Sequence, residues 1–390
     1  MSRIDEILND ATGQGYTPDD IKASVILILK DLFENKNKLA QFAMTSDILQ
    51  IWDFILRYHN ESSFMLSVKL ILNYYRQAYH ENPLAVKKIY KDMFNHFSNR
   101  ENIMWSISKN KMDLENTNLY DFTSLCLSRI GSILEVNLKS LLVEFYALLR
   151  IAKERPIELE KIMGFDFGVI VNNILNTYGF ESILKISPSN LKVSDWRNIA
   201  YHHTYAITNN DDVMCEYGKN EKKQFIIDRK QLIYYTHEIV KCTNIFHIVH
   251  WIFFFDHFDE IVESCKADNL EHIHMRDEIW KESLRISLLG QGYQLVEFQT
   301  SKLLTSTKLF DALNTGTLNK QFELQRKIHA SQFLYNIWSY FPAETLCVYY
   351  CDKNGEIKAI FKVSGEVCEL IGKGEKELSY LVGKVEFIKV

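Results

Sequence analysis

The spacing of hydrophobic residues indicates helices along most of the chain, because apolar positions recur at three- and four-residue steps. In the first 110 residues, Thr17-Pro18-Asp19-Asp20 and Asn82-Pro83 have the composition of helix starts. In both, a capping residue precedes a proline in the first turn. No group of catalytic residue types stands out here, so this region is predicted to be a helical scaffold or a partner-binding region.

The strongest helical pattern lies in the middle of the chain, over residues 119–154. Its apolar stripe consists of Ile130, Leu134, Leu138, Leu141, Phe145 and Leu149. A shorter helix is predicted over 167–176, and a second long helix over 229–257 is apolar almost all round, which is typical of a buried central helix. Between them, residues 213–217 and 224–227 are expected to form a short hairpin.

The last third of the chain combines two patterns. Residues 262–340 have helical spacing, whereas residues 346–351 and 356–363 alternate between apolar and polar positions as strands do. Asn354-Gly355 between them is the preferred two-residue hairpin turn. Residues 377–390 offer a further strand or two. The pattern therefore predicts a small β-containing unit at the C-terminal end of a helical chain.

These elements predict a mainly α protein with three consecutive regions. Residues 1–112 form a helical N-terminal region, residues 113–260 a central helical bundle, and residues 261–390 a C-terminal α+β region. Composition supports long helices, since five prolines and 15 glycines are few chain breakers for 390 residues. A hydrophobic content of 47% with a net charge of −5 excludes a disordered chain. It also argues against a protein that coats nucleic acid by bulk charge, but leaves room for a local nucleic-acid site.

A cytoplasmic location is expected. The first ten residues lack the basic and apolar segments of a signal peptide. The most apolar stretch, Ile245–Phe255, is too short to span a membrane and contains His247 and His250. Those two histidines lack an obvious third metal ligand, so core or interface positions are favoured for them and no metal or other cofactor is expected. The seven cysteines include no Cys-x-x-Cys pair and are interpreted as reduced core residues.

The segment Asp195–Tyr205 carries the most informative chemistry. Within it, Arg197 and His202 are five residues apart, and Asn198 and His202 are four apart and share a helix face. Asn198 is therefore positioned to orient the imidazole of His202. A guanidinium offers forked donors to phosphate oxygens, and a histidine transfers protons near neutral pH. The 2′-hydroxyl of RNA is an internal nucleophile, so such a pair suits RNA cleavage without a metal.

Arg197-Asn198-Ile199-Ala200-Tyr201-His202 resembles the RNxxxH signature of HEPN-domain ribonucleases. The resemblance covers residues 115–260, and Gly164-Phe165-Asp166-Phe167-Gly168 lies where many members have a similar Gly/Phe segment. It implies a HEPN-like helical bundle. It also implies metal-independent RNA cleavage that leaves a 2′,3′-cyclic phosphate and a 5′-hydroxyl. Members include abortive-infection proteins, toxins of toxin–antitoxin pairs and effector nucleases of antiviral defence.

By that resemblance, Arg197 binds and polarises the scissile phosphate, His202 acts in acid–base catalysis and Asn198 supports the pair. His203 is the second candidate for the catalytic histidine, because a looser spacing accepts it. His203-Thr204-Tyr205 also resembles the HxY ending of a toxin subgroup, although the distance from the arginine is one residue too long for that subgroup.

Further residues near the motif are candidates for binding RNA. Tyr201 and Tyr205 are expected either to stack on bases or to pack in the core. Lys222 and Lys223, in a basic run after the motif, form either a solvated turn or part of a groove for the RNA backbone.

The chain has one RNxxxH motif, whereas the family pairs two across a dimer, so a homodimer with a composite active site is expected. A nuclease lethal to its host must be restrained, so the flanking regions are candidates for sensing or inhibition, and a regulatory or antitoxin protein is a further candidate partner. The alternative is a non-catalytic helical module that dimerises or binds a protein or nucleotide partner.

Overall fold

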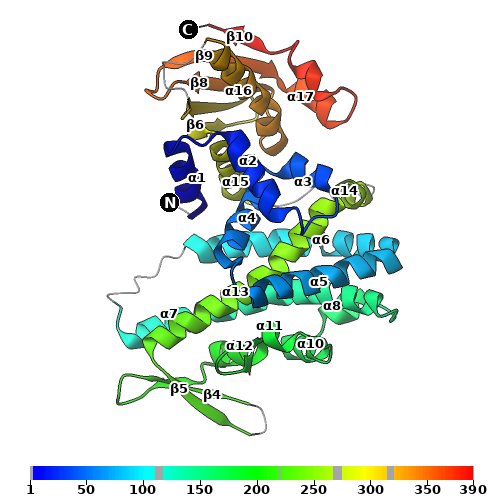
Figure 1. Ribbon diagram of the computed structural model, residues 1–390, viewed down its shortest axis with the longest axis vertical. Coiled ribbons are helices and arrows are strands. Elements are labelled where there is room, and N and C mark those ends of the chain that lie inside the picture. Colours follow the sequence, from blue (N-terminus) through cyan, green and yellow to red (C-terminus); the bar gives the residue numbers. More distant parts are fainter. Residues whose placement is uncertain (1–2, 110–116, 219–220, 267–274, 314–319, 390) are drawn as a thin grey trace. The chain divides into compact units, whose positions relative to one another are not determined.

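The computed structural model describes residues 3–109, 117–218, 221–266, 275–313 and 320–389, and it is mainly helical (Figure 1). Contacts divide the chain into two compact units. The first, here called the sheet unit, comprises residues 1–30, 39–56 and 277–390. The second, the bundle unit, comprises residues 31–38 and 57–276. This grouping differs from three consecutive regions because the N-terminal helices are divided between the units.

The bundle unit contains the strongest helices of the sequence pattern. They are α5 (Ser62–Glu81), α6 (Pro83–Lys109), α7 (Leu119–Ser132), the π-helical segment η1 (Ile133–Leu138), α8 (Lys139–Ala152), α9 (Leu159–Met163), α10 (Phe167–Leu175), α11 (Glu181–Leu184), α12 (Val193–His202), α13 (Arg229–Asp256) and α14 (Phe258–Lys266). The predicted helices over 119–154, 167–176 and 229–257 are therefore confirmed, and the first of them is one continuous run with a π-helical middle. A further helix, α3 (Lys36–Phe42), has residues in both units.

The core of the bundle unit forms around α13. This helix packs against α5, α7, η1 and α8, and Figure 1 shows it running along the bundle. Its sequence is apolar on nearly every side, and Phe246 and Phe253 are fully buried. Burial all round explains the pattern, because a helix with one solvent face would carry a polar stripe. Among the described helices, none has the length and hydrophobicity needed to cross a bilayer.

The predicted hairpin is confirmed and belongs to a three-stranded sheet. The strands are β3 (Tyr205–Ile207), β4 (Val213–Tyr217) and β5 (Lys223–Ile227), in the order β3-β4-β5 and antiparallel throughout. A two-residue pair, β1 (Lys185–Ile186) and β2 (Leu191–Lys192), precedes α12. The motif segment is helical only as far as His202, where α12 ends, and Tyr205 begins β3.

A glycine allows α12 to lie close to α7. A Cβ atom at Gly131 would lie 3.2 Å from the Cβ of Ala200 and 3.2 Å from the ring of Tyr201. We expect Gly131→Val to lower the free energy of unfolding by about 1–3 kcal/mol, because the extra side chain pushes the two helices apart. Gly168→Ala is the control. Gly168 lies on α10, and a Cβ atom there would lie 3.9 Å from the Cβ of Ser194 on α12, which is an ordinary contact. Urea denaturation measures both; a Gly131→Val variant as stable as the control contradicts the packing.

The sheet unit combines helices with a five-stranded sheet, against which α15, α16 and α17 pack (Figure 1). The helices are α1 (Arg3–Gly13), α2 (Pro18–Leu29), α4 (Ser46–Tyr58), α15 (Asp277–Gly290), α16 (Lys320–Tyr340), α17 (Gly365–Gly372) and the 3₁₀ turn η2 (Leu378–Leu381). The strands are β6 (Tyr293–Thr300), β7 (Leu304–Asp311), β8 (Thr345–Cys351), β9 (Ile357–Ser364) and β10 (Glu386–Ile388). Their order is β10-β9-β8-β7-β6, with only the β7–β8 pair parallel among these described strands. The start of α2 is capped by Thr17, as predicted.

The helical expectation for residues 262–340 is wrong at β6 and β7. The reason lies in β7, whose inward positions are Thr305, Thr307, Leu309 and Asp311, each at most 1% exposed. Three of these four inward side chains are polar, so the strand buries one face without hydrophobic alternation. Buried and more exposed positions alternate along β7, but the buried positions are mostly polar, so hydrophobic and polar residues do not alternate in its sequence.

Asp311 is buried because it pairs with Arg326 of α16. The guanidinium donates to both carboxylate oxygens, and the hydroxyl of Tyr350 also donates to Asp311 at 2.7 Å. Nearby, His329 lies 2.9 Å from the side-chain oxygen of Gln291. Burial, with a contribution from the Arg326 charge, lowers the pKa of His329 to about 4.

The lowered pKa of His329 predicts a sheet unit that weakens in acid. The unfolded chain protonates this histidine near pH 6.5 and the folded chain only near 4, so stability falls as the pH drops through that interval. The loss is at most about 3 kcal/mol. Hydrogen exchange of β8 and β9 at pH 7 and pH 5 measures the part of this loss that falls between those pH values, about 2 kcal/mol, and His329→Gln should remove most of the difference. An equal pH effect in the variant would contradict the assignment.

Candidate functional site

The RNxxxH segment lies on α12 of the bundle unit. The helix is capped at its start, where the carboxylate of Asp195 accepts a hydrogen bond from the backbone N–H of Lys192 at 3.2 Å. It ends at His203, which adopts a left-handed conformation with φ 51°. One side of α12 is buried by Trp196, Ile199 and Ala200. Arg197, Asn198, Tyr201 and His202 lie on the other sides of the helix.

Arg197 is held in place by three neighbours. Its Nε donates to the Oε2 atom of Glu135 at 2.9 Å, and its guanidinium lies 4.7 Å from the centre of the Tyr201 ring. Its Nη1 donates to Asn198 at 3.4 Å. In the described part of the chain, Nη2 makes no hydrogen bond, so this nitrogen remains available to a phosphate oxygen. The side chain is 26% exposed, which leaves it accessible from solvent.

Glu135 comes from the π-helical segment η1 between α7 and α8. A π-helical turn changes the direction of the side chains that follow it and is frequent at functional sites. Glu135 also accepts a hydrogen bond from Lys139 at 2.8 Å. Partial burial raises the pKa of Glu135, but the hydrogen bonds from Lys139 and Arg197 outweigh it and the net shift is downward. Glu135 is therefore a carboxylate at neutral pH.

His202 and His203 are both exposed at the C-terminal end of α12. His202 is the last helical residue, and His203 is the cap, with its ring 6.2 Å from the ring of Tyr205. Asn198 is exposed and bonds to Arg197 rather than to His202. The expected role of Asn198 as an orienting group for the imidazole is thus replaced, in this structure, by a contact to the arginine.

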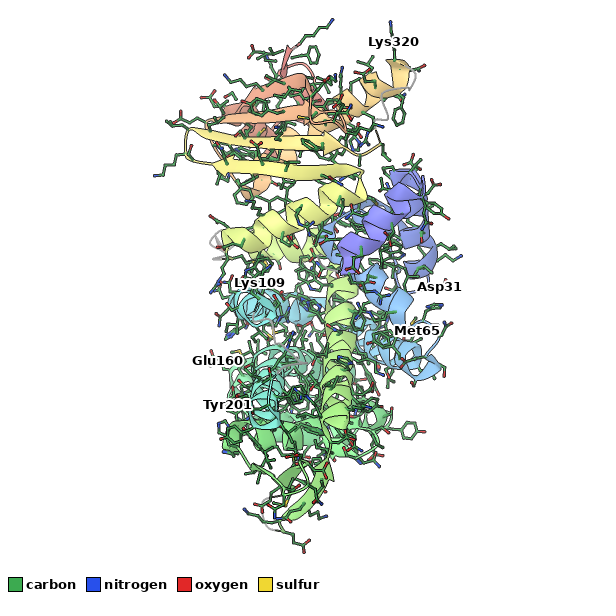
Figure 2. All side chains as sticks on the ribbon, turned by 90° about the vertical axis from the view of Figure 1, so that its left-hand side faces the viewer. Asp31, Met65, Lys109, Glu160, Tyr201 and Lys320 are labelled. Carbon is green, nitrogen blue, oxygen red and sulfur yellow. The ribbon has the colours of Figure 1, made fainter. Side chains whose placement is uncertain are left out.

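The remaining predicted binding residues are distributed around the motif. Tyr201 is 46% exposed and marks the surface of the bundle unit in Figure 2. Tyr205 is half-buried in β3, while Lys222, just before β5, and Lys223, the first residue of β5, are both exposed. Lys222 is paired with Glu216. The structure therefore brings Tyr201 to the arginine and places the two lysines on the adjoining hairpin.

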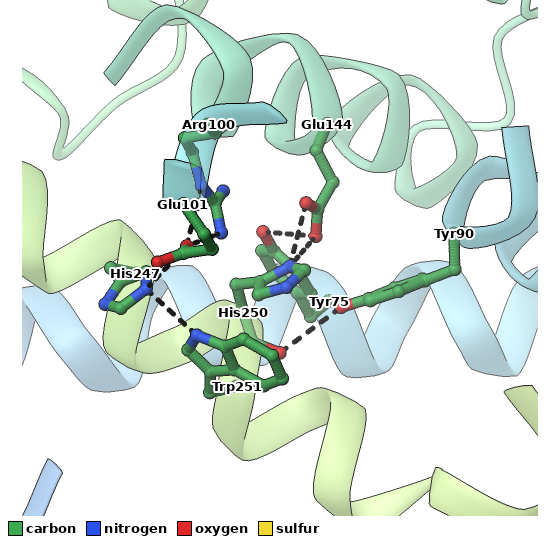
Figure 3. Close-up of polar contacts among 8 residues, drawn as sticks. All are labelled: Tyr75, Tyr90, Arg100, Glu101, Glu144, His247, His250 and Trp251. Carbon is green, nitrogen blue, oxygen red and sulfur yellow. Dashed lines mark hydrogen bonds and ion pairs between the residues drawn. The ribbon is translucent and has the colours of Figure 1, made fainter. Parts of the chain in front are cut away.

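A second polar cluster lies inside the bundle, away from solvent (Figure 3). Glu144 of α8 is fully buried, its two oxygens lie 2.9 Å from Nδ1 of His250, and the hydroxyl of Tyr75 donates to it at 3.0 Å. Burial lowers the pKa of His250 although Glu144 opposes the shift. Such a sealed network fixes the packing of α5, α8 and α13 and cannot meet a large substrate.

His247 also has two protein partners. It accepts a hydrogen bond from the indole of Trp251 at 2.9 Å, and it lies 3.6 Å from Glu101. In the part of the chain that the structure describes, no three His, Cys, Asp or Glu side chains come together as a metal site requires. All seven cysteines are buried and unbridged, as expected of core residues.

Two carboxylates that the structure places in polar contacts were not predicted from the sequence. Glu135 lies beside the apolar stripe of 119–154 and gives no signal of its contact with α12, because that contact depends on tertiary packing. Glu144 does give a signal, since it stands between Leu141 and Phe145 on the apolar face and a charge there requires a buried partner.

Comparison of this chain with protein-family models, with curated proteins and with solved structures gives no match.

Proposed function

We propose that this protein is a metal-independent RNA endonuclease of the HEPN type. The observation that carries the proposal is the motif helix α12. It presents Arg197 and His202 at the surface of a helical bundle, with the arginine fixed by Glu135 and Tyr201. An arginine that is already held in one orientation loses less side-chain entropy when it binds a phosphate. It can therefore stabilise the negative charge on the phosphate without first being ordered.

The proposed reaction is an internal displacement at phosphorus. A base removes the proton of the RNA 2′-hydroxyl, the 2′-oxygen bonds to phosphorus, and the bond from phosphorus to the 5′-oxygen breaks. The leaving 5′-oxygen takes up a proton, and the products are a 2′,3′-cyclic phosphate and a 5′-hydroxyl. Arg197 stabilises the negative charge on the phosphate oxygens, and His202 serves in the proton transfers.

The proposal includes a homodimer, because this chain has one motif. Two copies of α12 related by a two-fold axis would place two arginines and two histidines at one phosphate. One imidazole would then accept the 2′-proton and the other would protonate the 5′-oxygen. Under this proposal the protein acts in the cytoplasm as a defence or toxin effector, and a regulatory or antitoxin protein restrains it.

Incubation of the purified protein with labelled single-stranded RNA and tRNA in excess EDTA tests the proposal. Cleavage that persists in EDTA supports a metal-independent ribonuclease. Absence of cleavage of both RNAs over a range of protein concentrations contradicts the proposal and favours the non-catalytic binding module.

The choice between the two histidines has its own test. His203 occupies the left-handed region, which asparagine tolerates better than most residues, so His203→Asn removes the imidazole without straining the cap. We expect the free energy of unfolding of this variant to lie within about 0.5 kcal/mol of the wild-type value. We also expect it to cleave RNA at nearly the wild-type rate. A loss of cleavage in His203→Asn, with His202→Asn active, would reassign the catalytic role to His203.

A further inference from the structure

A pocket of about 280 Å³ opens in the bundle unit between α6, the η1–α8 segment and α9. Its apolar wall includes Val136, Val143 and Met163. Its polar lining consists of His96, Asn99, Arg100, Glu135, Lys139 and Ser140. A cavity of about 150 Å³ already accommodates benzene, so this one has room for a ring together with a small polar group.

Two polar atoms of the lining residues have no partner among the residues that the structure describes. They are Nη1 of Arg100 and Oγ of Ser140. Arg100 is 1% exposed, and its other nitrogens, Nε and Nη2, donate to Glu101 at 3.2 and 2.9 Å (Figure 3). A buried donor without an acceptor costs about 1–3 kcal/mol. Both atoms would regain that hydrogen bond from an oxygen acceptor at the inner end of the pocket.

The charges around the pocket favour a negatively charged acceptor. Arg100 and Lys139 contribute two positive charges to the lining, and Glu135 contributes one negative charge. Glu135 is shared with a third cation, because Arg197 donates to it from α12. Arg100 is itself paired with Glu101, so three cations stand against two carboxylates and the local balance is one positive charge, although the net charge of the whole chain is −5. A carboxylate or phosphate forms charge-assisted hydrogen bonds with such a set.

We propose that this pocket binds a small molecule with an apolar body and a carboxylate or phosphate group. The anionic group lies toward Arg100, Lys139 and Ser140, and the body lies against Val136, Val143 and Met163. The pocket is separate from the proposed RNA-cleaving residues. Glu135 links the two, because it lines the pocket and also accepts the hydrogen bond from Arg197. The proposal holds whether or not the chain cleaves RNA.

Three probes with the same ring separate the contributions of the anionic groups. They are phenyl phosphate, benzoate and benzyl alcohol, and isothermal titration or saturation-transfer NMR measures their binding to the full chain. We expect saturable binding of at least one of the two anions below 10 mM, with benzyl alcohol at least tenfold weaker. The tighter of the two anions identifies whether the pocket prefers phosphate or carboxylate.

Two variants and a control locate the site. Val136→Trp fills the pocket and Lys139→Met removes a charge, and both should weaken anion binding at least tenfold. Lys161→Met on α9, an exposed lysine outside the pocket lining, should bind like wild type. Circular dichroism confirms that each variant is folded. The proposal is overturned if neither anion binds by 10 mM, if benzyl alcohol binds as tightly as the anions, or if Val136→Trp binds like wild type.

Discussion

Arg197→Ala should reduce RNA cleavage by about 10²–10³-fold, because it removes the group that stabilises charge on the scissile phosphate. His202→Ala should reduce it by about 10²–10⁴-fold through the loss of proton transfer. Both side chains are partly or fully exposed, and Glu135 keeps Lys139 as a partner when Arg197 is absent. The variants should therefore remain folded, and initial cleavage rates of a labelled RNA measure the effect.

A matched histidine controls for the loss of an imidazole as such. His80 is an exposed histidine in the last turn of α5, in the same unit as His202. His80→Ala should cleave RNA at the wild-type rate. Arg197→Lys adds a second comparison, because lysine keeps the charge but loses the fork that can hold Glu135 and a phosphate together. If Arg197→Ala and His202→Ala cleave RNA at the wild-type rate, the motif residues do not take part in catalysis.

Glu144→Ala should destabilise the bundle unit by about 3–5 kcal/mol, the cost of breaking a buried ionic or hydrogen-bonded pair. The substitution leaves the hydroxyl of Tyr75 and Nδ1 of His250 buried without their acceptor. It also empties space in a fully buried position. Denaturant unfolding followed by tryptophan fluorescence is suitable, because Trp251 packs 5.2 Å from the His250 ring.

Two further variants separate the buried pair from carboxylates in general. Glu144→Gln keeps the shape and one acceptor, so it should cost less than Glu144→Ala. Glu181→Ala removes a surface ion pair with Lys185 and should leave the stability of the bundle unit close to that of wild type, because exposed ion pairs contribute little. If the free energy of unfolding of Glu144→Ala lies within about 1 kcal/mol of the wild-type value, the buried cluster around Glu144 does not stabilise the bundle unit.

The helices of the bundle unit are predictable from the sequence because packing and hydrophobic period agree there. The stripe through Leu134, Leu141 and Phe145 and the nearly uniform apolarity of α13 both express burial directly. The strands β6 and β7 are not predictable in this way. The buried face of β7 includes the polar residues Thr305, Thr307 and Asp311, and the partners of Thr305 and Asp311, Phe341 and Arg326, come from other parts of the chain.

For the candidate site, the sequence supplies the residue types but not the contacts. Arg197 and His202 are identified by a local pattern, and the structure places both at the surface of a bundle. The anchoring of Arg197 by Glu135 joins residues 62 positions apart in the chain. The spacing of hydrophobic residues within one helix cannot predict a contact between residues so far apart in the sequence. The same holds for the close approach of Gly131 to Tyr201, which depends on how α7 and α12 pack.

The end groups of the RNA fragments produced by wild-type protein in excess EDTA test the central claim most directly. The account predicts fragments with 2′,3′-cyclic phosphate and 5′-hydroxyl ends, together with no cleavage at a nucleotide whose 2′-hydroxyl is replaced by hydrogen. These products require the internal nucleophile and the proton transfers assigned to His202. Fragments with 5′-phosphate and 3′-hydroxyl ends, or cleavage that stops when EDTA is added, would contradict it.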